Sequence, residues 1–456
     1  MKSLTLNFIR QALSLPLPSE NGGVEIKRIV TDSRDIQSGD VFFALSGERF
    51  DAHDFAAEVL AKGAAAVVVS RQDCAALPGA LKVGDTLTAL QTLARAWRNE
   101  INPFVFGITG SGGKTTVKEM LAGILRHRFG KEAVLATAGN FNNHIGLPLT
   151  LLKLTPAHRY AVIEMGMNHF GELAALTQIA RPDAALVNNA LRAHIGCGFG
   201  SVGDIARAKS EIYQGLGADG LALVPAEDAH AAVFQTAAQG LKQQTFGVQS
   251  GDIHAENIVL EPLSCTFDLV AGNGRAAVRL PVPGRHNVAN AAAAAALALA
   301  AGLSLQEVSD GLCGFTNIKG RLNVKRGING TTVLDDTYNA NPDSMKAALD
   351  VLARFPAPRV FVMGDIGELG DSEAAAMHAE VGAYARDKGI ESAYFVGGYS
   401  AAAAEAFGGN GLWFAGKTLL IESLAHNLPP GANVLVKGSR FMKMEEVAEA
   451  LLEKAV

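Results

Sequence analysis

The chain has 456 residues, 48% of them hydrophobic and 19% charged, a composition that predicts a globular protein of about three domains. Its 40 basic and 45 acidic residues give a formal net charge of −5 without any basic block, which argues against a nucleic-acid partner. No apolar run is long enough for a signal peptide or a membrane span, and the four scattered cysteines favour neither a zinc site nor disulfides, so we expect a cytoplasmic protein.

Residues 1–82 predict a small α/β domain with short strands and one helix. We expect strands at Val24–Ile29, Val41–Ala44 and Ala65–Val69 and a helix at Phe55–Lys62. Two polar clusters lie between these elements, at residues 31–34 and 47–54. They are either solvated loops or anchors for an anionic ligand such as a diphosphate, since each has an arginine beside small hydroxyl or glycine residues.

A glycine-rich stretch, GITGSGGKTT at residues 107–116, follows the short apolar run Phe104–Phe106 and precedes a segment with helical periodicity. In such a unit, backbone N–H groups of the loop wrap a phosphate chain, and the helix N-terminus adds positive potential. Lys114 would then contact the β- and γ-phosphates, and the Thr115 hydroxyl would bind Mg²⁺. Ile108 departs from the usual glycine spacing, so the alternative is a turn with a chance Lys-Thr pair. The flanking strand and helix favour a nucleoside triphosphate site.

From about residue 102 the chain alternates apolar runs with helical patterns, which indicates an α/β domain with a largely parallel sheet. We expect a helical connector at Asp85–Trp97 and strands at Tyr160–Ile163, Ala184–Val187 and Gly220–Val224. Ligands of such sheets bind beyond the carboxyl ends of the strands, so Glu164 is placed to hold Mg²⁺ opposite Thr115, although a strand also ends in glutamate where it reaches solvent. His194 and Lys209, taken alone, are a loop residue and a surface lysine on the predicted helix Asp204–Gly215.

Residues 252–282 have the alternating polarity of a β-rich insertion. Next, Pro283–Asn290 opens an alanine-rich helix that ends at Gly302. Asn287 and Asn290 are three residues apart and share one face of its first turn. Their amides are either ligands for a base or a ribose, or ordinary caps of the helix.

A third α/β unit follows from about residue 321. Strands are expected at Thr332–Leu334, Arg359–Met363, Ala393–Val396, Leu412–Ala415 and Val434–Val436, and a last helix at Met442–Lys454. Polar residues gather after three of these strands, at residues 335–341, 364–365 and 437–440. The unit lacks a G-x-G-x-x-G stretch after its first strand, so we do not interpret it as a dinucleotide-binding domain.

Together these motifs resemble those of the Mur ligase family, the ATP-dependent amide-forming enzymes of bacterial peptidoglycan assembly, over essentially the whole chain. The matching stretches are GITGSGGKTT with its Ile108, Asn140–Pro148, Glu164, His194, Ala208–Tyr213, Gly284–Asn290, Gly320-Arg321, Asp336 and Lys437–Arg440. The resemblance implies an α/β fold of three domains. These are a small N-terminal UDP-sugar-binding domain (1–82), a central ATP-binding domain with a P-loop and a mononucleotide-binding parallel sheet (83–320), and a C-terminal Rossmann-like ligase domain (321–456).

Within the family, SGERFDAHDF, DDTYNANPDSM and VMGDIGELG are similar to the member that joins D-alanyl-D-alanine to UDP-N-acetylmuramoyl-tripeptide (UDP-MurNAc-tripeptide). The alternative is the sibling that adds the third amino acid to UDP-MurNAc-dipeptide. That sibling carries Asp-Asn-Pro-Arg in its C-terminal domain, whereas here Asn341-Pro342 is followed by Asp343. A nucleotide switch or a silent binding protein is disfavoured, because Asn-Lys-x-Asp is absent and the residues expected to hold metal are present.

The resemblance implies a reaction through an acyl phosphate, which ATP forms on the tripeptide carboxylate and the dipeptide amine then attacks, so no protein nucleophile is required. It implies UDP-MurNAc-tripeptide and D-alanyl-D-alanine as partners, a monomer, and hinge closure between the second and third domains around ATP. Catalysis is assigned to Lys114, Glu164, His194, Lys209 and Arg321. Two Mg²⁺ ions are assigned to Thr115, Glu164, His194 and Lys209, the last as a carbamate formed with CO₂.

The resemblance also implies the residues that bind ligands. ATP is assigned to Gly107, Thr109, Gly110, Ser111, Gly112, Gly113, Lys114, Thr115, Thr116, Asn287, Asn290, Arg321 and Asp336. The UDP end of the nucleotide sugar is assigned to Ser33, Arg34 and Arg49, and Gly47, in the second polar cluster, is assigned to substrate binding. The remaining substrate contacts are assigned to Asn143, Asn339, Asn341, Lys437, Ser439 and Arg440.

Overall fold

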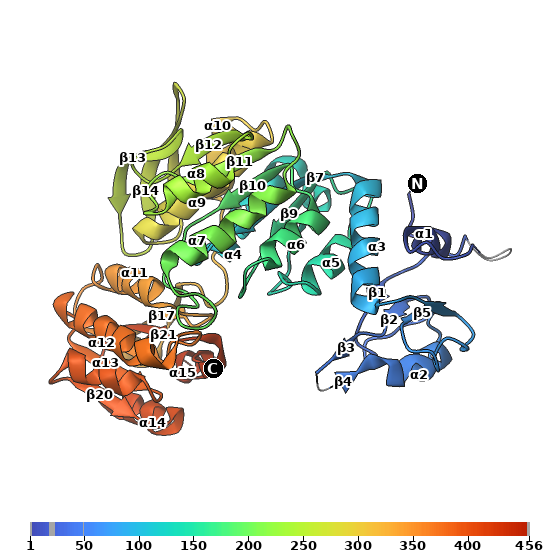
Figure 1. Ribbon diagram of the computed structural model, residues 1–456. Coiled ribbons are helices and arrows are strands. Elements are labelled where there is room, and N and C mark those ends of the chain that lie inside the picture. The colour runs from blue at the N-terminus through green and yellow to red at the C-terminus, as the bar shows by residue number, and fades with distance from the viewer. Residues whose placement is uncertain (1, 18–22, 49, 454–456) are drawn as a thin grey trace.

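The computed structural model describes residues 2–17, 23–48 and 50–453, and it contains three α/β units that follow one another along the chain (Figure 1). The central domain, cyan through green to yellow in Figure 1, lies between the blue N-terminal domain and the orange C-terminal domain. This arrangement confirms the predicted three-domain α/β architecture, while the boundaries after residues 82 and 320 stay predictions. Within the described ranges, no helix combines the length and the apolar character needed to cross a membrane.

The N-terminal domain is built on a parallel sheet in the order β1-β2-β5-β6. Its elements are α1 (Leu6–Ala12), β1 (Ile29–Val30), β2 (Val41–Phe43), β3 (Ser46–Gly47), β4 (Phe50–Asp51), a 3₁₀ turn (Ala52–Phe55), α2 (Ala56–Ala61), β5 (Ala66–Val69) and β6 (Ala80–Lys82). Every residue of β2 and β5 is buried, as expected for strands covered on both faces. β3 and β4 pair antiparallel as a separate hairpin that follows β2.

The strand predicted at Val24–Ile29 is wrong for most of its length. Only Ile29 belongs to β1. The residues before it lie beside the start of the chain, where the Ile26 N–H donates to the carbonyl of Leu4 at 2.7 Å. Ile26 is buried by this pairing, which accounts for its apolar side chain without a place in the sheet.

Three further elements of this domain were not predicted: α1, the β3–β4 hairpin and β6. Thr5 caps α1 by accepting the Phe8 N–H at 3.2 Å, but Ile9 is the one residue of this helix that is buried, so its seven residues carry little helical periodicity. β3, β4 and β6 have two or three residues each, which is too short for an alternating pattern.

The central domain contains a nine-stranded sheet in the order β15-β14-β13-β12-β11-β10-β7-β9-β8. Its strands are β7 (Phe104–Thr109), β8 (Val134–Ala136), β9 (Tyr160–Glu164), β10 (Ala184–Val187), β11 (Leu221–Pro225), β12 (Lys242–Phe246), β13 (Ile253–Leu260), β14 (Cys265–Ala271) and β15 (Gly274–Leu280). β7 to β13 run parallel, and β13, β14 and β15 are antiparallel. The predicted β-rich insertion is therefore confirmed, whereas β8 and β12 were missed.

Helices cover both faces of the central sheet. One face packs against α4 (Lys114–Phe129), α9 (Arg285–Ala300) and α10 (Leu305–Cys313). The other packs against α3 (Thr86–Ile101), α5 (Gly146–Leu151), α6 (Glu172–Ala180), α7 (Val202–Ser210) and α8 (Ala231–Ala237). Residues 290–298 of α9 are all buried, and their small alanine side chains allow close packing of this helix in the core. The helix predicted at Asp204–Gly215 is α7 followed by a 3₁₀ turn at Glu211–Gly215.

The C-terminal domain contains a six-stranded sheet in the order β16-β17-β21-β18-β19-β20, parallel except for β16. Its strands are β16 (Asn323–Arg326), β17 (Thr332–Asp336), β18 (Arg359–Gly364), β19 (Ser392–Val396), β20 (Gly411–Phe414) and β21 (Asn433–Lys437). Its helices are α11 (Pro342–Leu352), α12 (Asp371–Asp387), α13 (Ser400–Phe407), α14 (Lys417–Asn427) and α15 (Glu445–Ala450).

The five strands predicted for this domain are confirmed, and β16 was missed. The last helix, predicted at Met442–Lys454, is wrong in its first turn. Lys443 has a left-handed backbone with φ of 48°, which separates a 3₁₀ turn from the helix α15 that follows. Lys454 lies outside the described residues.

Candidate active site

Two adjoining cavities lie between the central and C-terminal domains. The larger, of about 430 Å³, is lined by residues that follow β7, β9 and β10 in the central domain and β17, β18 and β21 in the C-terminal domain. The smaller, of about 180 Å³, lies beside the first turns of α9 and α11. Both are lined by Gly112, Gly113, Arg321, Ser344 and Lys437. The cavities therefore meet at the glycine loop, beyond the carboxyl ends of the strands, where open parallel sheets bind ligands.

A wider groove of about 1380 Å³ lies at the opposite edge of the central sheet. It is lined by Phe104, Asp183, Leu221 and Lys242, which stand at or near the amino ends of their strands. None of the residues that the sequence analysis predicted for the site lines this groove. We therefore place the candidate site in the two smaller cavities.

Neighbouring asparagines hold the glycine loop in place. Gly113 has φ of 78°, and a Cβ atom there would lie 2.3 Å from Oδ1 of Asn290 and 2.5 Å from Nδ2 of Asn188, so only glycine fits. Asn188 Nδ2 donates to the Gly112 carbonyl at 2.9 Å, and Asn189 Oδ1 accepts the Gly112 N–H at 2.8 Å. Asn188 and Asn189 were not predicted as site residues; the available signal was their position directly after β10, the neighbour of β7.

Lys114 and Thr115 begin α4 and face the larger cavity. Lys114 Nζ donates to the Gly110 carbonyl at 2.7 Å, and burial lowers the pKa of this lysine, although the nearby Glu164 carboxylate opposes the shift. Thr115 Oγ1 accepts a hydrogen bond from Nη2 of Arg321 at 3.3 Å. The Arg321 guanidinium also lies 4.3 Å from the ring centroid of Tyr338, within the range of a cation–π contact.

The other predicted loop residues have different surroundings. Gly107 and Thr109 belong to β7 and line neither cavity. Gly110 follows that strand, and a Cβ atom there would lie 2.9 Å from Cβ of Asn188. Ser111 lines the larger cavity and Thr116 the smaller one.

Glu164, the last residue of β9, points a carboxylate into the larger cavity from a site that is only 3% exposed. Oε1 accepts a hydrogen bond from Asn142 Nδ2 at 2.8 Å, whereas the buried Oε2 has no partner among the described residues. A buried oxygen without a partner costs about 1–3 kcal/mol or more of folding free energy, which a bound cation would offset. The alternative that Glu164 merely reaches solvent is therefore wrong.

The donor set fits Mg²⁺ that arrives with phosphate groups. Across the described part of the chain, no three His, Cys, Asp or Glu side chains converge into a closed metal site. Mg²⁺ is usually held by one or two carboxylates together with phosphate oxygens and waters. The Glu164 carboxylate and the Thr115 hydroxyl, which both line the larger cavity, meet that requirement.

Lys209 is buried, so the alternative that it is a surface lysine is wrong, whereas His194 is a partly buried loop residue. His194 has φ of 63° and lines the larger cavity. Burial, together with the charges of Lys209 and Lys114, lowers the pKa of His194 to about 4, so its imidazole is neutral at pH 7. Lys209 is 2% exposed on α7, and burial beside the Lys114 charge holds its pKa well below the usual value. A neutral amine is the form of lysine that reacts with CO₂.

Glu368, in the loop after β18, is a cavity residue that the sequence analysis did not single out. Its Oε2 lies 3.5 Å from Nδ1 of His194, and its backbone is left-handed with φ of 60°. Burial raises the pKa of Glu368, against the opposing charge of Lys114. The signal was present in VMGDIGELG, which was used for the family resemblance but not for the site.

Arg192 joins the two domains at the edge of the cavities. Its Nη2 donates to Oδ1 of Asp343 at 2.6 Å, and its Nη1 donates to Oε2 of Glu380 at 2.7 Å. Its backbone N–H also donates to Asp343, at 3.0 Å. Arg192 follows β10, whereas its partners begin α11 and lie within α12, so no local pattern indicated this contact.

Asn287 and Asn290 lie on the first turn of α9 and line the smaller cavity. Asn290 Nδ2 donates to Asn287 Oδ1 at 3.2 Å, and Asn287 Nδ2 donates to the Pro283 carbonyl at 2.7 Å. The N-cap is Gly284, which has no side chain, so the capping alternative is wrong.

Asp336 and Lys437 face each other at the ends of the adjacent strands β17 and β21. Asp336 Oδ2 lies 2.6 Å from Lys437 Nζ, and its Oδ1 accepts the Leu322 N–H at 3.2 Å. Lys437 also donates to the Asn339 carbonyl at 2.9 Å. Burial lowers the pKa of Lys437, and the Asp336 carboxylate opposes that shift.

The remaining residues predicted for substrate contacts differ in whether they line a cavity and in whether their side chains are already hydrogen-bonded within the fold. Asn143, Asn339, Asn341 and Arg440 line the larger cavity. The side chain of Asn341 caps α11, and that of Asn143 accepts backbone N–H groups at the start of α5. Ser439 is buried and lines neither cavity; its hydroxyl accepts the Gly367 N–H at 2.7 Å, so it holds the loop after β18.

The residues predicted for the UDP end, together with Gly47, lie in the N-terminal domain and line neither cavity. Ser33 and Arg34 follow β1, and the Arg34 guanidinium is paired with Asp32 at 2.6 Å. Gly47 is exposed in β3. Arg49 lies outside the described residues.

Three stretches of the chain match descriptions of Mur ligase domains. Residues 25–102 match the Mur ligase family catalytic domain, residues 108–298 the Mur ligase middle domain, and residues 320–440 the Mur ligase glutamate ligase domain. A relative from Escherichia coli (strain K12), UDP-N-acetylmuramoyl-tripeptide–D-alanyl-D-alanine ligase, is 43% identical over 457 residues, which cover 99% of this chain and 99% of the relative.

Solved structures agree with this match. A crystal structure of MurF from Acinetobacter baumannii has a TM-score of 0.90 and 40% sequence identity, and the match covers 100% of both chains. The MurF ligase from Thermotoga maritima in complex with ADP has a TM-score of 0.82 and 28% identity, over 93% of this chain and 96% of that chain. All three domains therefore have counterparts in these relatives.

Proposed function

The chain belongs to the Mur ligase family, and we propose that it is the member that joins D-alanyl-D-alanine to UDP-MurNAc-tripeptide with the consumption of ATP. The product is UDP-MurNAc-pentapeptide, a precursor of peptidoglycan. The observation that carries the proposal is that two cavities meet at the glycine loop, one lined by the helix asparagines and the other by Glu164, His194 and the C-terminal loops. The sibling that adds the third amino acid is not favoured, since the relative with 43% identity is a D-alanyl-D-alanine ligase.

We propose that ATP lies across both cavities. Its adenosine would occupy the smaller one, beside Asn287, Asn290 and Asp336, and its phosphates would reach the larger one through the glycine loop. Lys114 and Arg321 would then neutralise the charge of the γ-phosphate. Thr115 and Glu164 would hold one Mg²⁺ and His194 would lie near a second; when bound, these ions would neutralise the phosphate oxygens as Lewis acids.

The proposed reaction has two steps, and each balances without a protein nucleophile. First, the terminal carboxylate of the tripeptide attacks the γ-phosphorus of ATP; ADP leaves and an acyl phosphate forms. Then the free amine of D-alanyl-D-alanine attacks the acyl carbon, the nitrogen loses a proton to solvent, and phosphate leaves from the tetrahedral intermediate. Both steps concentrate negative charge on oxygen, which the cationic side chains of the larger cavity are suited to stabilise.

We propose that Lys209 acts as a carbamate. Its burial beside Lys114 favours the neutral amine, and CO₂ would convert that amine into an anionic group able to support the second Mg²⁺. The same conversion would replace the repulsion between two neighbouring lysines with an attraction. Removal of CO₂ and bicarbonate from the assay is therefore expected to lower the activity.

The peptide ends of the substrates are assigned to the C-terminal loops that line the larger cavity, including Asn339, Asn341 and Arg440. The UDP end is assigned to the N-terminal domain. Because Ser33 and Gly47 line neither cavity, we propose that domain closure brings the anchored nucleotide sugar to ATP. Arg192 and its acidic partners would support the contact between the central and C-terminal domains.

The deciding experiment measures phosphate release by the purified protein with Mg²⁺-ATP and UDP-MurNAc-tripeptide, with and without D-alanyl-D-alanine. Release that depends on the dipeptide, with a matching gain in the mass of the nucleotide product, is expected. If UDP-MurNAc-dipeptide with a diamino acid supports the reaction instead, the sibling assignment replaces this one. ATP hydrolysis that ignores every amine would refute the ligase assignment.

A further inference from the structure

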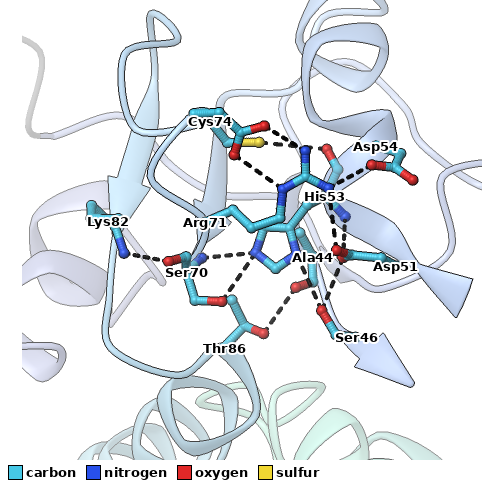
Figure 2. Close-up of polar contacts among 11 residues, drawn as sticks. Ala44, Ser46, Asp51, His53, Asp54, Ser70, Arg71, Cys74, Lys82 and Thr86 are labelled. Carbon is cyan, nitrogen blue, oxygen red and sulfur yellow. Dashed lines mark hydrogen bonds and ion pairs between the residues drawn. The ribbon is translucent and has the colours of Figure 1, made fainter. Parts of the chain in front are cut away.

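A buried histidine in the N-terminal domain links three separate segments. His53 is 2% exposed, and its Nδ1 lies 2.6 Å from Oδ1 of Asp51, at the end of the β3–β4 hairpin. Its Nε2 accepts the backbone N–H of Ser70 at 2.8 Å, directly after β5. The ring nitrogen that carries the hydrogen is therefore Nδ1, and this N–H donates a hydrogen bond to Asp51. Figure 2 shows His53 between Ser70 on one side and Asp51 and Ser46 on the other.

Ser70, His53 and Asp51 are linked in the same sequence as the residues of a serine–histidine–aspartate catalytic triad, but the histidine is not able to act as a base. The Ser70 hydroxyl lies 3.2 Å from Nε2 of His53. The lone pair of Nε2 already accepts the Ser70 backbone N–H, so it is not free to take a proton from the hydroxyl. These three residues, His53, Asp51 and Ser70, are therefore a structural hydrogen-bond framework and not a catalytic site.

Asp51 is the point where the framework meets the hairpin. Its carboxylate accepts hydrogen bonds from the His53 ring and backbone, from the Ser46 hydroxyl at 2.9 Å and from Arg71 at 3.2 Å. Partial burial alone would raise the pKa of Asp51, but these bonds together lower it well below its usual range. Arg71 also bonds to Asp54 and Asp73, so a dense set of ion pairs surrounds the base of the hairpin (Figure 2).

The hairpin depends on this support. β3 and β4 have two residues each, and most of their surface is exposed. An isolated two-stranded hairpin of any length is marginal in water. The contacts of Asp51 and the stacking of Phe50 on Phe55, with centroids 5.6 Å apart, fix its orientation.

The hairpin lies where a parallel sheet binds its ligands. β1, β2 and β5 are adjacent and parallel, and the segment after each strand carries a polar residue: Ser33 after β1, Ser46 in the hairpin after β2, and Ser70 after β5. The carboxyl ends of these strands share one edge of the sheet. The hairpin and the loop at Ser33 therefore stand side by side at the expected binding edge.

We propose that His53 is a positioning residue for the nucleotide sugar: through Asp51 and Ser70 it fixes the β3–β4 hairpin on β5 in the orientation that receives the UDP end. This inference rests on the proposed function, which assigns the UDP end to the N-terminal domain. The network also occupies the Asp51 carboxylate with internal donors, so its charge is not directed at an incoming diphosphate.

The test compares His53→Ala and His53→Asn with the wild type in steady-state assays of all three substrates. His53→Ala is expected to raise the KM for UDP-MurNAc-tripeptide by about tenfold or more, because the two partly buried hydrogen bonds that link the hairpin to the segment after β5 are lost. The kcat and the KM values for ATP and D-alanyl-D-alanine should change less than about twofold, since the ATP site lies in other domains. His53→Asn keeps a donor at the Nδ1 position and is expected to recover part of the loss.

The matched control is Asp40→Asn. Asp40 is a buried carboxylate of the same sheet, paired with Arg28, but it stands directly before β2, at the edge opposite the hairpin. Its loss should lower thermal stability without a selective rise in the KM for the nucleotide sugar. If His53→Ala does not fold, Ser46→Ala removes one exposed donor to Asp51 and should give a smaller selective rise.

Hydrogen exchange separates positioning from general instability. In the folded His53 variant, amides of residues 44–52 should exchange faster while β2 and β5 stay protected. Faster exchange with an unchanged KM for the nucleotide sugar would overturn the proposal, and so would equal losses for all three substrates. A wild-type protein that does not bind UDP-MurNAc-tripeptide in calorimetry would instead refute the proposed function, which is a distinct result.

Discussion

Arg321 donates a hydrogen bond to the hydroxyl of Thr115 at 3.3 Å, across 206 positions of the chain. Thr115 stands on the first turn of α4, and Arg321 directly precedes the C-terminal sheet. The contact therefore places the segment between the central and C-terminal domains against the glycine loop. Because Arg321 also lies over Tyr338, its guanidinium is held in the larger cavity from both sides.

Arg321→Ala is expected to lower kcat by about 100-fold or more, because a cation positioned at a transferring phosphoryl group stabilises the transition state. The kcat of Arg321→Lys should lie between those of the wild type and Arg321→Ala. A lysine keeps the positive charge but lacks the planar guanidinium and its contact with Tyr338. Phosphate release at saturating substrates measures both. Arg326→Ala, at an exposed site with a pair to Glu453, is the control. A kcat of Arg321→Ala within threefold of the wild type would contradict the prediction.

Glu164→Gln is expected to raise the Mg²⁺ concentration needed for half-maximal activity by about tenfold or more, since loss of a metal-directed carboxylate weakens the site. The amide keeps an oxygen that accepts from Asn142, so the fold should hold. Titration of Mg²⁺ against activity and against the binding of a fluorescent ATP analogue gives two readouts. Identical Mg²⁺ curves for variant and wild type would show that Glu164 does not hold the ion.

The burial of Lys209 is expected to make the free energy of unfolding depend on pH. Burial holds its folded pKa below the unfolded value, so between those two values the unfolded chain binds one proton more than the native protein. The free energy of unfolding then rises with pH in that window, with a contribution of at most about 1.4 kcal/mol per pH unit. Lys209→Met removes this contribution. Urea unfolding of both proteins from pH 7 to 9, in CO₂-free buffer, should give a smaller slope for the variant; equal slopes would contradict the assignment.

Arg192→Ala is expected to loosen the contact between the central and C-terminal domains, because it removes the pairs with Asp343 and Glu380. The variant should have a larger radius of gyration in small-angle scattering and a KM for ATP raised several-fold. In the wild type, ATP with UDP-MurNAc-tripeptide should reduce the radius of gyration as the domains close. A scattering curve that neither the substitution nor the ligands change would contradict domain closure.

Local sequence patterns were sufficient to predict much of this site. The glycine loop lies within one strand–loop–helix unit, and Glu164 ends a strand with a clear apolar run, so neighbouring residues specify both. Lys209 and His194 needed the family resemblance, because burial by distant elements separates them from ordinary surface residues.

Local patterns did not mark the residues that depend on pairing across the chain. Glu368 and Arg192 enter the site only once the C-terminal domain packs against the central one. The apolar residues at Val24–Ile29 suggested a strand, but the pairing of Ile26 with Leu4 places them beside the chain start. The β3–β4 hairpin is held by side chains rather than by its own strands, so no periodic pattern marked it.

The placement of Ser33 and Gly47 outside both cavities has a consequence for substrate choice. A nucleotide sugar anchored in the N-terminal domain has to deliver its terminal carboxylate to a fixed point in another domain. One amino acid more or fewer moves that carboxylate by about 3.3–3.6 Å in an extended peptide, which is farther than an in-line attack tolerates. If the UDP end is anchored in the N-terminal domain as proposed, the distance from that anchor to the glycine loop in the closed protein would select the length of the peptide stem, independently of contacts with its side chains.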